Sequence, residues 1–62
     1  MIIYHVFTHN TDEFCSTFEE ASEIFNEFVA DYGCARLYEE ERDEDGEVIE
    51  ENCIKSHGEY PM

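Results

Sequence analysis

Apolar residues recur along the first half of the chain with two different periods. Residues 2–8 are β-branched and aromatic on both alternating faces, which predicts a strand covered on both sides. Residues 9–15 are mostly polar and predict a connection. Beyond them, apolar residues return at steps of three and four, the period of one helix face. This stripe consists of Phe18, Ala21, Phe25, Phe28 and Tyr32, widened by Ile24 and Val29.

Capping residues stand at both ends of the predicted helix. Either Ser16 or Thr17 can cap its first turn, because a glutamate follows each of them three residues later, as in a capping box. Gly33 predicts a left-handed cap after Tyr32. We expect the apolar stripe to pack in the core. The alternative is an exposed docking face.

Two further strands are predicted at residues 34–42 and 47–55, joined by an acidic turn at 43–46. An Asp-Gly pair favours a hairpin because glycine accepts a positive φ. A two-residue turn at Asp45 and Gly46 sets Leu37 opposite Ile54, Tyr38 opposite Cys53, Glu40 opposite Glu51 and Glu41 opposite Glu50. The last two pairs oppose like charges, which is unfavourable, so the register stays open.

These elements predict one α+β domain over residues 1–62, in the order β-α-β-β. A strand, a helix and a strand favour a right-handed crossover, and the hairpin makes the last two strands neighbours. The result is a three-stranded sheet with one helix packed on one face and residues 2–8 at an edge. An apolar edge strand is usually covered. We expect a homodimer that buries strand 2–8 or the sheet face away from the helix; the alternative is a monomer covered by Tyr60 and Pro61.

The charge balance limits the choice of partners. Seventeen acidic residues face only three basic ones, for a formal net charge of −14. Such a field repels phosphates and anionic membranes, and it favours a basic protein partner. No apolar run approaches the ~20 residues of a membrane span, and the first residues do not resemble a signal peptide. We therefore expect a cytoplasmic protein that binds neither nucleic acid nor membrane directly.

Metal binding and catalysis have little support in the sequence. The odd number of cysteines fits free thiols in a reducing cytoplasm. No CxxC pair, helical HxxxH, GxSxG or phosphate-binding loop is present. Gly46 stands fourth in the acidic turn, whereas the glycine of an EF-hand calcium loop stands sixth. We expect no metal, no cofactor and no enzymatic activity. The residues weighed as zinc ligands are His5, His9, Cys15, Cys34, Cys53 and His57.

Acidic residues crowd the predicted hairpin, where nine of the thirteen residues from 39 to 51 carry a carboxylate. Residues two apart on a strand are ~6.6 Å apart, and residues four apart on a helix are ~6 Å apart. Rigid carboxylates at this spacing can occupy a phosphate-binding groove. The predicted partner-binding residues are Glu39, Glu40, Glu41, Asp43, Glu44, Asp45, Glu47, Glu50 and Glu51, with Glu19, Glu20, Glu23 and Glu27 as a second stripe.

With this Glu-rich hairpin, its small size and its charge, the chain resembles the DNA-mimic proteins that phages and mobile elements encode. Its ending, Cys53-Ile54-Lys55-Ser56-His57-Gly58-Glu59-Tyr60-Pro61, is similar to that of short phage reading frames. The resemblance implies an inhibitor in the host cytoplasm that blocks a basic groove of a restriction, CRISPR, recombination or transcription protein. The alternative is a non-enzymatic, dimeric interaction module that uses Tyr4, Tyr38 and Tyr60, with acids that only solubilise it.

Overall fold

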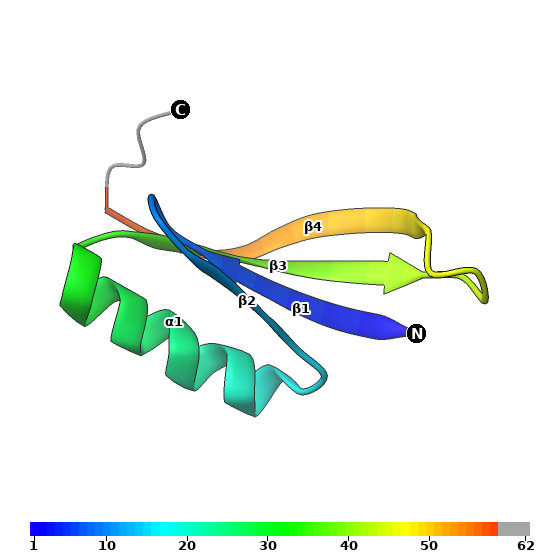
Figure 1. Ribbon diagram of the computed structural model, residues 1–62, viewed down its shortest axis with the longest axis horizontal. Helices are drawn as coiled ribbons and strands as arrows, with labels where there is room; N and C mark the ends of the chain where they lie inside the picture. Colours follow the sequence, from blue (N-terminus) through cyan, green and yellow to red (C-terminus); the bar gives the residue numbers. More distant parts are fainter. Residues whose placement is uncertain (59–62) are drawn as a thin grey trace.

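A four-stranded antiparallel sheet carries one helix on one of its faces (Figure 1). The computed structural model describes residues 1–58. Within them, no helix combines the length and the apolarity needed to cross a membrane. The strands stand in the order β2-β1-β3-β4. The elements are β1 (Ile2–Phe7), β2 (Asp12–Cys15), α1 (Phe18–Tyr32), β3 (Ala35–Arg42) and β4 (Val48–His57).

The α+β class is confirmed, but the sheet has one strand more than the sequence predicts. Residues 12–15, expected within a connection, pair with β1 through a turn in which the Thr8 N–H donates to the Thr11 carbonyl at 3.0 Å. As a result β1 lies between β2 and β3, and the prediction that strand 2–8 forms an edge is wrong. The crossover from the first strand is also wrong, because β1 and β3 are antiparallel. The helix instead connects β2 to β3, which run parallel to each other on either side of β1.

The helix begins and ends as its capping residues predict. Thr17 is the N-cap, and its hydroxyl accepts a hydrogen bond from the Glu20 N–H at 3.3 Å. Gly33 adopts a φ of 82°, and its N–H donates to the Val29 carbonyl at 2.9 Å. Both ends are local features of the sequence, since each cap bonds within one turn of itself.

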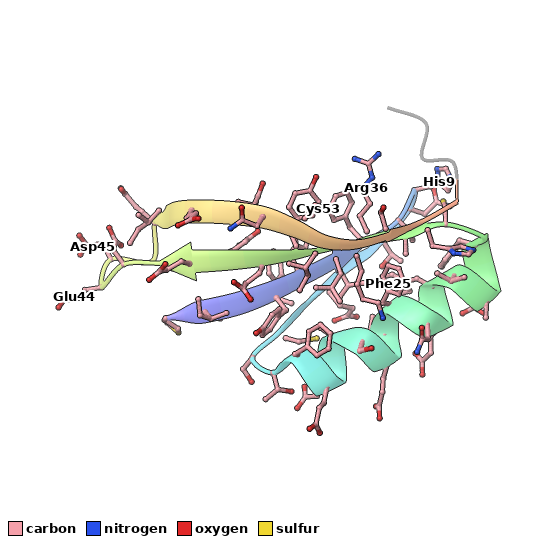
Figure 2. The ribbon with its side chains drawn as sticks, turned by 180° about the vertical axis from the view of Figure 1, so that it is seen from behind. His9, Phe25, Arg36, Glu44, Asp45 and Cys53 are labelled. Atoms are coloured by element: carbon pink, nitrogen blue, oxygen red, sulfur yellow. The ribbon has the colours of Figure 1, made fainter. Side chains whose placement is uncertain are left out.

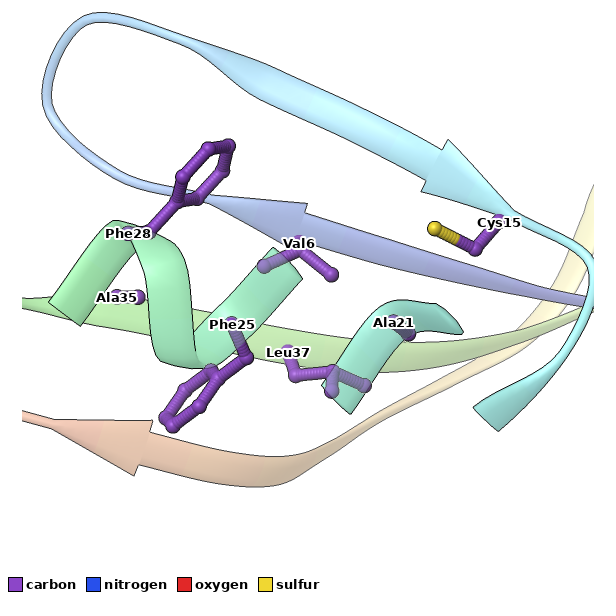
Figure 3. Close-up of a cluster of buried hydrophobic side chains, with 7 residues drawn as sticks. All are labelled: Val6, Cys15, Ala21, Phe25, Phe28, Ala35 and Leu37. Atoms are coloured by element: carbon purple, nitrogen blue, oxygen red, sulfur yellow. The ribbon is translucent and has the colours of Figure 1, made fainter. Parts of the chain in front are cut away.

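The core fills the space between α1 and the sheet (Figure 3). Only the middle of the predicted helix stripe is buried, because Phe18 and Tyr32 at its ends are 45% and 42% exposed. A fully buried side chain of this kind stabilises the fold by ~1.5–3 kcal/mol, so a cluster this small leaves little margin. The cluster consists of Val6, Cys15, Ala21, Phe25, Phe28, Ala35 and Leu37.

The β3–β4 hairpin reaches most of its predicted pairs through a different turn. The Asp43 N–H donates to the Glu47 carbonyl at 3.0 Å, so the loop has three residues instead of two and ends on Gly46 at a φ of 85°. An irregularity beside Arg42 then restores the predicted register. The confirmed pairs are Tyr38 with Cys53, Glu40 with Glu51 and Glu41 with Glu50.

A second irregularity, between Leu37 and Tyr38, changes which β4 side chain faces the helix at the other end of the hairpin. Leu37 lies opposite Lys55, so the predicted pair of Leu37 with Ile54 is wrong. The Lys55 ammonium donates to the Ser22 hydroxyl at 3.4 Å and lies 4.9 Å from the centre of the Phe25 ring. A β-bulge re-aims the side chains after it, and here it turns a cation toward the helix, beside the core.

Candidate functional site

The pleat of the sheet sorts its side chains onto two faces of different chemistry. The Tyr4 ring meets Phe18 at the start of the helix, with centroids 5.9 Å apart, so Tyr4 and its alternating neighbours face α1. Phe7 and Tyr38 stack on the opposite side at 5.4 Å. We call that opposite side of the sheet the open face. Figure 2 shows Arg36 on it, pointing away from the helix.

On the helix side, carboxylates from the helix and from the hairpin lie on one side of the molecule, all of them exposed except the half-buried Glu39. Glu39 is paired with Tyr4 across the sheet and Glu41 with Ile2, so the pleat turns both toward the helix side. Glu50, opposite Glu41, joins them. The hairpin extends past the first turn of α1, so the helix does not lie over the helix-side face of the hairpin there (Figure 1). We call the following set the acidic face: Glu19, Glu20, Glu23, Glu27, Glu39, Glu41 and Glu50.

The remaining hairpin acids predicted to bind a partner lie elsewhere. Glu40 and Glu51 belong to the open face, and Glu40 is only 3% exposed. Asp43 holds the turn, because its carboxylate accepts from two backbone N–H groups at 2.9 and 3.0 Å. Glu44, Asp45 and Glu47 are exposed at the tip of the hairpin, where Figure 2 labels the first two. The nine acids therefore do not form one array.

Very few of these carboxylates are neutralised within the fold. Among residues 1–58, Glu40 is the one acid paired with a lysine or arginine, Arg42; Asp12 and Glu40 also lie beside His5, which is charged only when protonated. No member of the acidic face pairs with a cation in this range. The face therefore projects a largely uncompensated negative field.

A row of aromatic rings crosses three strands of the open face. Phe14 of β2 stacks on His5 of β1, with centroids 4.2 Å apart, and His5 lies 5.1 Å from Phe7. Phe7 stacks in turn on Tyr38 of β3. Phe14 remains 55% exposed, and the Arg42 guanidinium lies 5.5 Å from its ring centre. This row is not predicted by the sequence pattern, in which Phe14 falls within a connection.

A buried carboxylate organises the polar side chains of this face. One oxygen of Glu40 accepts from Nε and Nη2 of Arg42 at 3.2 and 2.7 Å, and the other lies 3.5 Å from Nδ1 of His5. Nε2 of His5 lies 2.8 Å from Asp12. Both ring nitrogens therefore face carboxylates. The adjacent shallow cavity, of about 290 Å³, is lined by His5, Phe7, Thr8, Asn10, Thr11 and Asp12.

A cysteine and a histidine that are 25 residues apart also meet. Nε2 of His9 lies 2.9 Å from Sγ of Cys34, and the Thr8 hydroxyl donates to the Cys34 carbonyl at 2.8 Å. No local spacing signals this pair, since it depends on the β1–β2 turn lying beside the start of β3. Cys34 is 2% exposed, so its thiol is closed to a substrate. The pair ties two segments of the fold together.

The residues weighed as zinc ligands do not converge. Within the described part of the chain, no three His, Cys, Asp or Glu side chains are grouped so that they could hold a metal ion. The three cysteines are free; Cys15 and Cys34 are buried and Cys53 is exposed. Burial raises the pKa of the Cys15 thiol, and the charges of Glu20 and Glu13 add to the effect. Cys15 is thereby kept neutral, as a core side chain should be.

Comparison of the chain with protein-family models, curated proteins and solved structures gave no match. Two surfaces of the described residues can act on other molecules. The acidic face can attract a cationic surface over a distance set by salt. The open face can bury aromatic area against another apolar surface.

Proposed function

We propose that this protein is a non-enzymatic inhibitor that places its acidic face in the basic, phosphate-binding groove of a nucleic-acid-binding protein. The observation that supports it is a set of carboxylates on a helix and a hairpin, exposed except for the half-buried Glu39, without cationic partners among residues 1–58. The backbone positions of these residues are fixed because their helix and strands are tied to one core. A basic groove recognises such an array by charge and by spacing.

The energetic cost of the acids supports a role in binding. Glu41 and Glu50 lie directly opposite each other, an arrangement that destabilises a hairpin. A net charge of −14 on 62 residues adds repulsion throughout the molecule. Solubility alone needs a net charge of only ~2–8 in a small domain. The excess is explained if the field attracts a partner.

Spacing supports a nucleic-acid-like target surface. Glu19, Glu23 and Glu27 follow one another at one helical turn, ~6 Å apart along the axis. Glu39 and Glu41 are ~6.6 Å apart on their strand. Phosphates along a nucleic-acid strand rise by ~3.4 Å per residue and lie about twice as far apart along the backbone. Lysine and arginine side chains placed to bind phosphates can therefore reach successive carboxylates.

A competition experiment with two charge-matched variants tests the proposal. The immobilised protein is used to capture partners from cell lysate at low salt, and bound proteins are challenged with excess duplex DNA or RNA. One variant carries Glu19→Gln, Glu23→Gln and Glu27→Gln on the acidic face. The other carries Glu44→Gln, Asp45→Asn and Glu47→Gln at the hairpin tip, so both lose three charges.

We expect nucleic acid to displace the captured protein, and the helix variant to lose it while the tip variant retains most of it. Partners that resist displacement would exclude competition for a phosphate groove. Equal losses in the two variants would show that net charge alone governs capture, which contradicts recognition by the acidic face.

The exposed aromatic row favours a second candidate, an interaction module whose acids serve only as a soluble surface. Of the three tyrosines considered for it, Tyr38 lies on the open face, Tyr4 is half-buried against the helix, and Tyr60 lies outside residues 1–58. A partner held by this route should survive both high salt and the helix variant.

A further inference from the structure

The open face carries an aromatic row that no helix of residues 1–58 covers, since the one helix there packs on the other side of the sheet. Phe14 and Cys53 are exposed on it, and Phe7 and Tyr38 are half-buried. Contiguous apolar surface of this kind marks interaction sites in soluble proteins.

We propose that the open face binds the open face of a second copy of this chain. Two of the three basic residues, Arg36 and Arg42, lie on it. Its acids are Glu40, which is paired with Arg42, Asp12 beside His5, and the exposed Glu51. The local charge is therefore much closer to balance than anywhere on the helix side. A second molecule of the same strongly negative protein meets the least repulsion here.

The edges of the sheet suit a second copy less well. β2 has four residues, which is a short template for pairing. β4 has ten, but its pairing with β3 is interrupted by two irregularities, and it carries Glu50 and Glu51. Bulges and charges on an edge strand oppose the addition of another strand. Strand 2–8 cannot pair with a twin through its edge, because it is hydrogen-bonded on both sides.

The geometry of the face suits packing against a second copy. Two sheets packed face to face lie ~10 Å apart, with each helix on the outside. This arrangement directs the two acidic faces away from each other and leaves them accessible.

Salt should strengthen this dimer, whereas it should weaken binding through the acidic face. Two copies of the same net charge repel, and salt screens the repulsion. We expect the dissociation constant for self-association to fall at least ~10-fold between low salt and ~0.5 M NaCl. Binding through the acidic face weakens over the same range. The two proposals can therefore fail independently.

Sedimentation velocity on the wild-type chain and two matched variants tests the dimer. Phe14→Asp places a charge on the open face, and Phe18→Asp places one on the helix side at a phenylalanine of similar exposure, 45% against 55%. We expect Phe14→Asp to raise the dissociation constant at least ~30-fold, the effect of placing a charge on an exposed aromatic contact. Phe18→Asp should change it by less than ~3-fold.

The exposed Cys53 thiol provides a second measurement that does not depend on either variant folding. Cys53 lies opposite Tyr38 on the open face, so a dimer should shield it from a maleimide. We expect its alkylation to slow as wild-type concentration and salt rise. A monomer at every concentration and salt, with constant Cys53 reactivity, overturns the proposal. Protection of Cys53 by a single-stranded oligonucleotide without self-association overturns it in favour of a base-stacking surface.

Discussion

Arg42 donates two hydrogen bonds to one oxygen of Glu40, at 2.7 and 3.2 Å, although both residues belong to a hairpin crowded with acids. The side chain of Glu40 is 5% exposed and that of Arg42 is 27% exposed. Burying a charge is costly unless it is paired and hydrogen-bonded. The pair therefore explains how a carboxylate can be buried in the most negative segment of the chain.

Arg42→Ala should leave this buried carboxylate without its guanidinium and lower the free energy of unfolding by ~2 kcal/mol. The expected loss is below the ~3–5 kcal/mol of a fully buried pair, because Arg42 is partly exposed. Urea denaturation followed by circular dichroism measures it. Adding Glu40→Gln to Arg42→Ala restores the wild-type net charge and removes the unpaired carboxylate, so it should recover part of the loss. If Arg42→Ala is as stable as the wild type, the pair contributes nothing.

Neutralising either Glu41 or Glu50 should stabilise the protein. Glu41→Gln or Glu50→Gln removes a directly opposed like-charge pair, and each should raise the free energy of unfolding by ~0.5 kcal/mol at low salt. Because they relieve the same repulsion, the double variant should gain less than the sum of the two. The gains should shrink in ~0.5 M NaCl. Additive gains that do not change with salt would mean that the two carboxylates do not interact.

The sequence predicts well the features that depend on neighbouring residues. The caps at Thr17 and Gly33, and the pairing of Tyr38 with Cys53, each follow from local capping or turn chemistry. β2 escaped prediction because it has only four residues, two of them acidic, and because its pairing with β1 depends on an ordinary polar turn. Because β2 was not predicted, β1 was expected at an edge of the sheet and parallel to β3, whereas it lies inside the sheet and antiparallel to β3.

In the candidate surfaces too, features set by neighbouring residues could be predicted, and features set by distant strands could not. The exposed acids of α1 and Glu41 with Glu50 could be predicted, because period and register place them. Burial of Glu40 could not, since it depends on His5 from β1 and on the unpredicted strand that supplies Asp12. The aromatic row was hidden for the same reason. Its rings come from three strands, and their order in the sheet was not known from the sequence.

Cys15 should make stability depend on alkaline pH. Burial raises the pKa of its thiol in the folded state. Below the ordinary thiol pKa both states hold the proton, and this contribution to stability is complete. As the pH rises above that value, the unfolded chain loses the proton first, so the free energy of unfolding falls until the folded-state pKa is passed. Urea denaturation between pH 7 and 10 under reducing conditions measures this fall.

Cys15→Ala should have a smaller decline in stability over that range than the wild type, whatever its stability at neutral pH. Cys53→Ala removes an exposed thiol and serves as the matched control. If the free energy of unfolding falls equally with pH in the wild type and in Cys15→Ala, ionisation of Cys15 does not oppose folding.

Gly58 should tolerate a methyl group less well than Gly46, although both adopt a positive φ, at 76° and 85°. A Cβ at Gly46 would meet nothing within 4 Å, so Gly46→Ala should cost only the ~1–2 kcal/mol of the left-handed backbone. A Cβ at Gly58 would collide with the Gly33 carbonyl oxygen and lie 3.0 Å from Cβ of Cys34. Gly58→Ala should therefore cost at least ~1 kcal/mol more.

Urea denaturation of the two variants measures that difference, and amide hydrogen exchange locates it. The clash at Gly58 should force the end of β4 away from the helix cap, so backbone N–H groups where Ala35 lies opposite His57 should exchange faster in Gly58→Ala and at the wild-type rate in Gly46→Ala. Equal stability losses with equal exchange would mean that the end of β4 is free to move. The packing of Gly58 against Gly33 and Cys34 would then contribute nothing to holding the long edge strand in place.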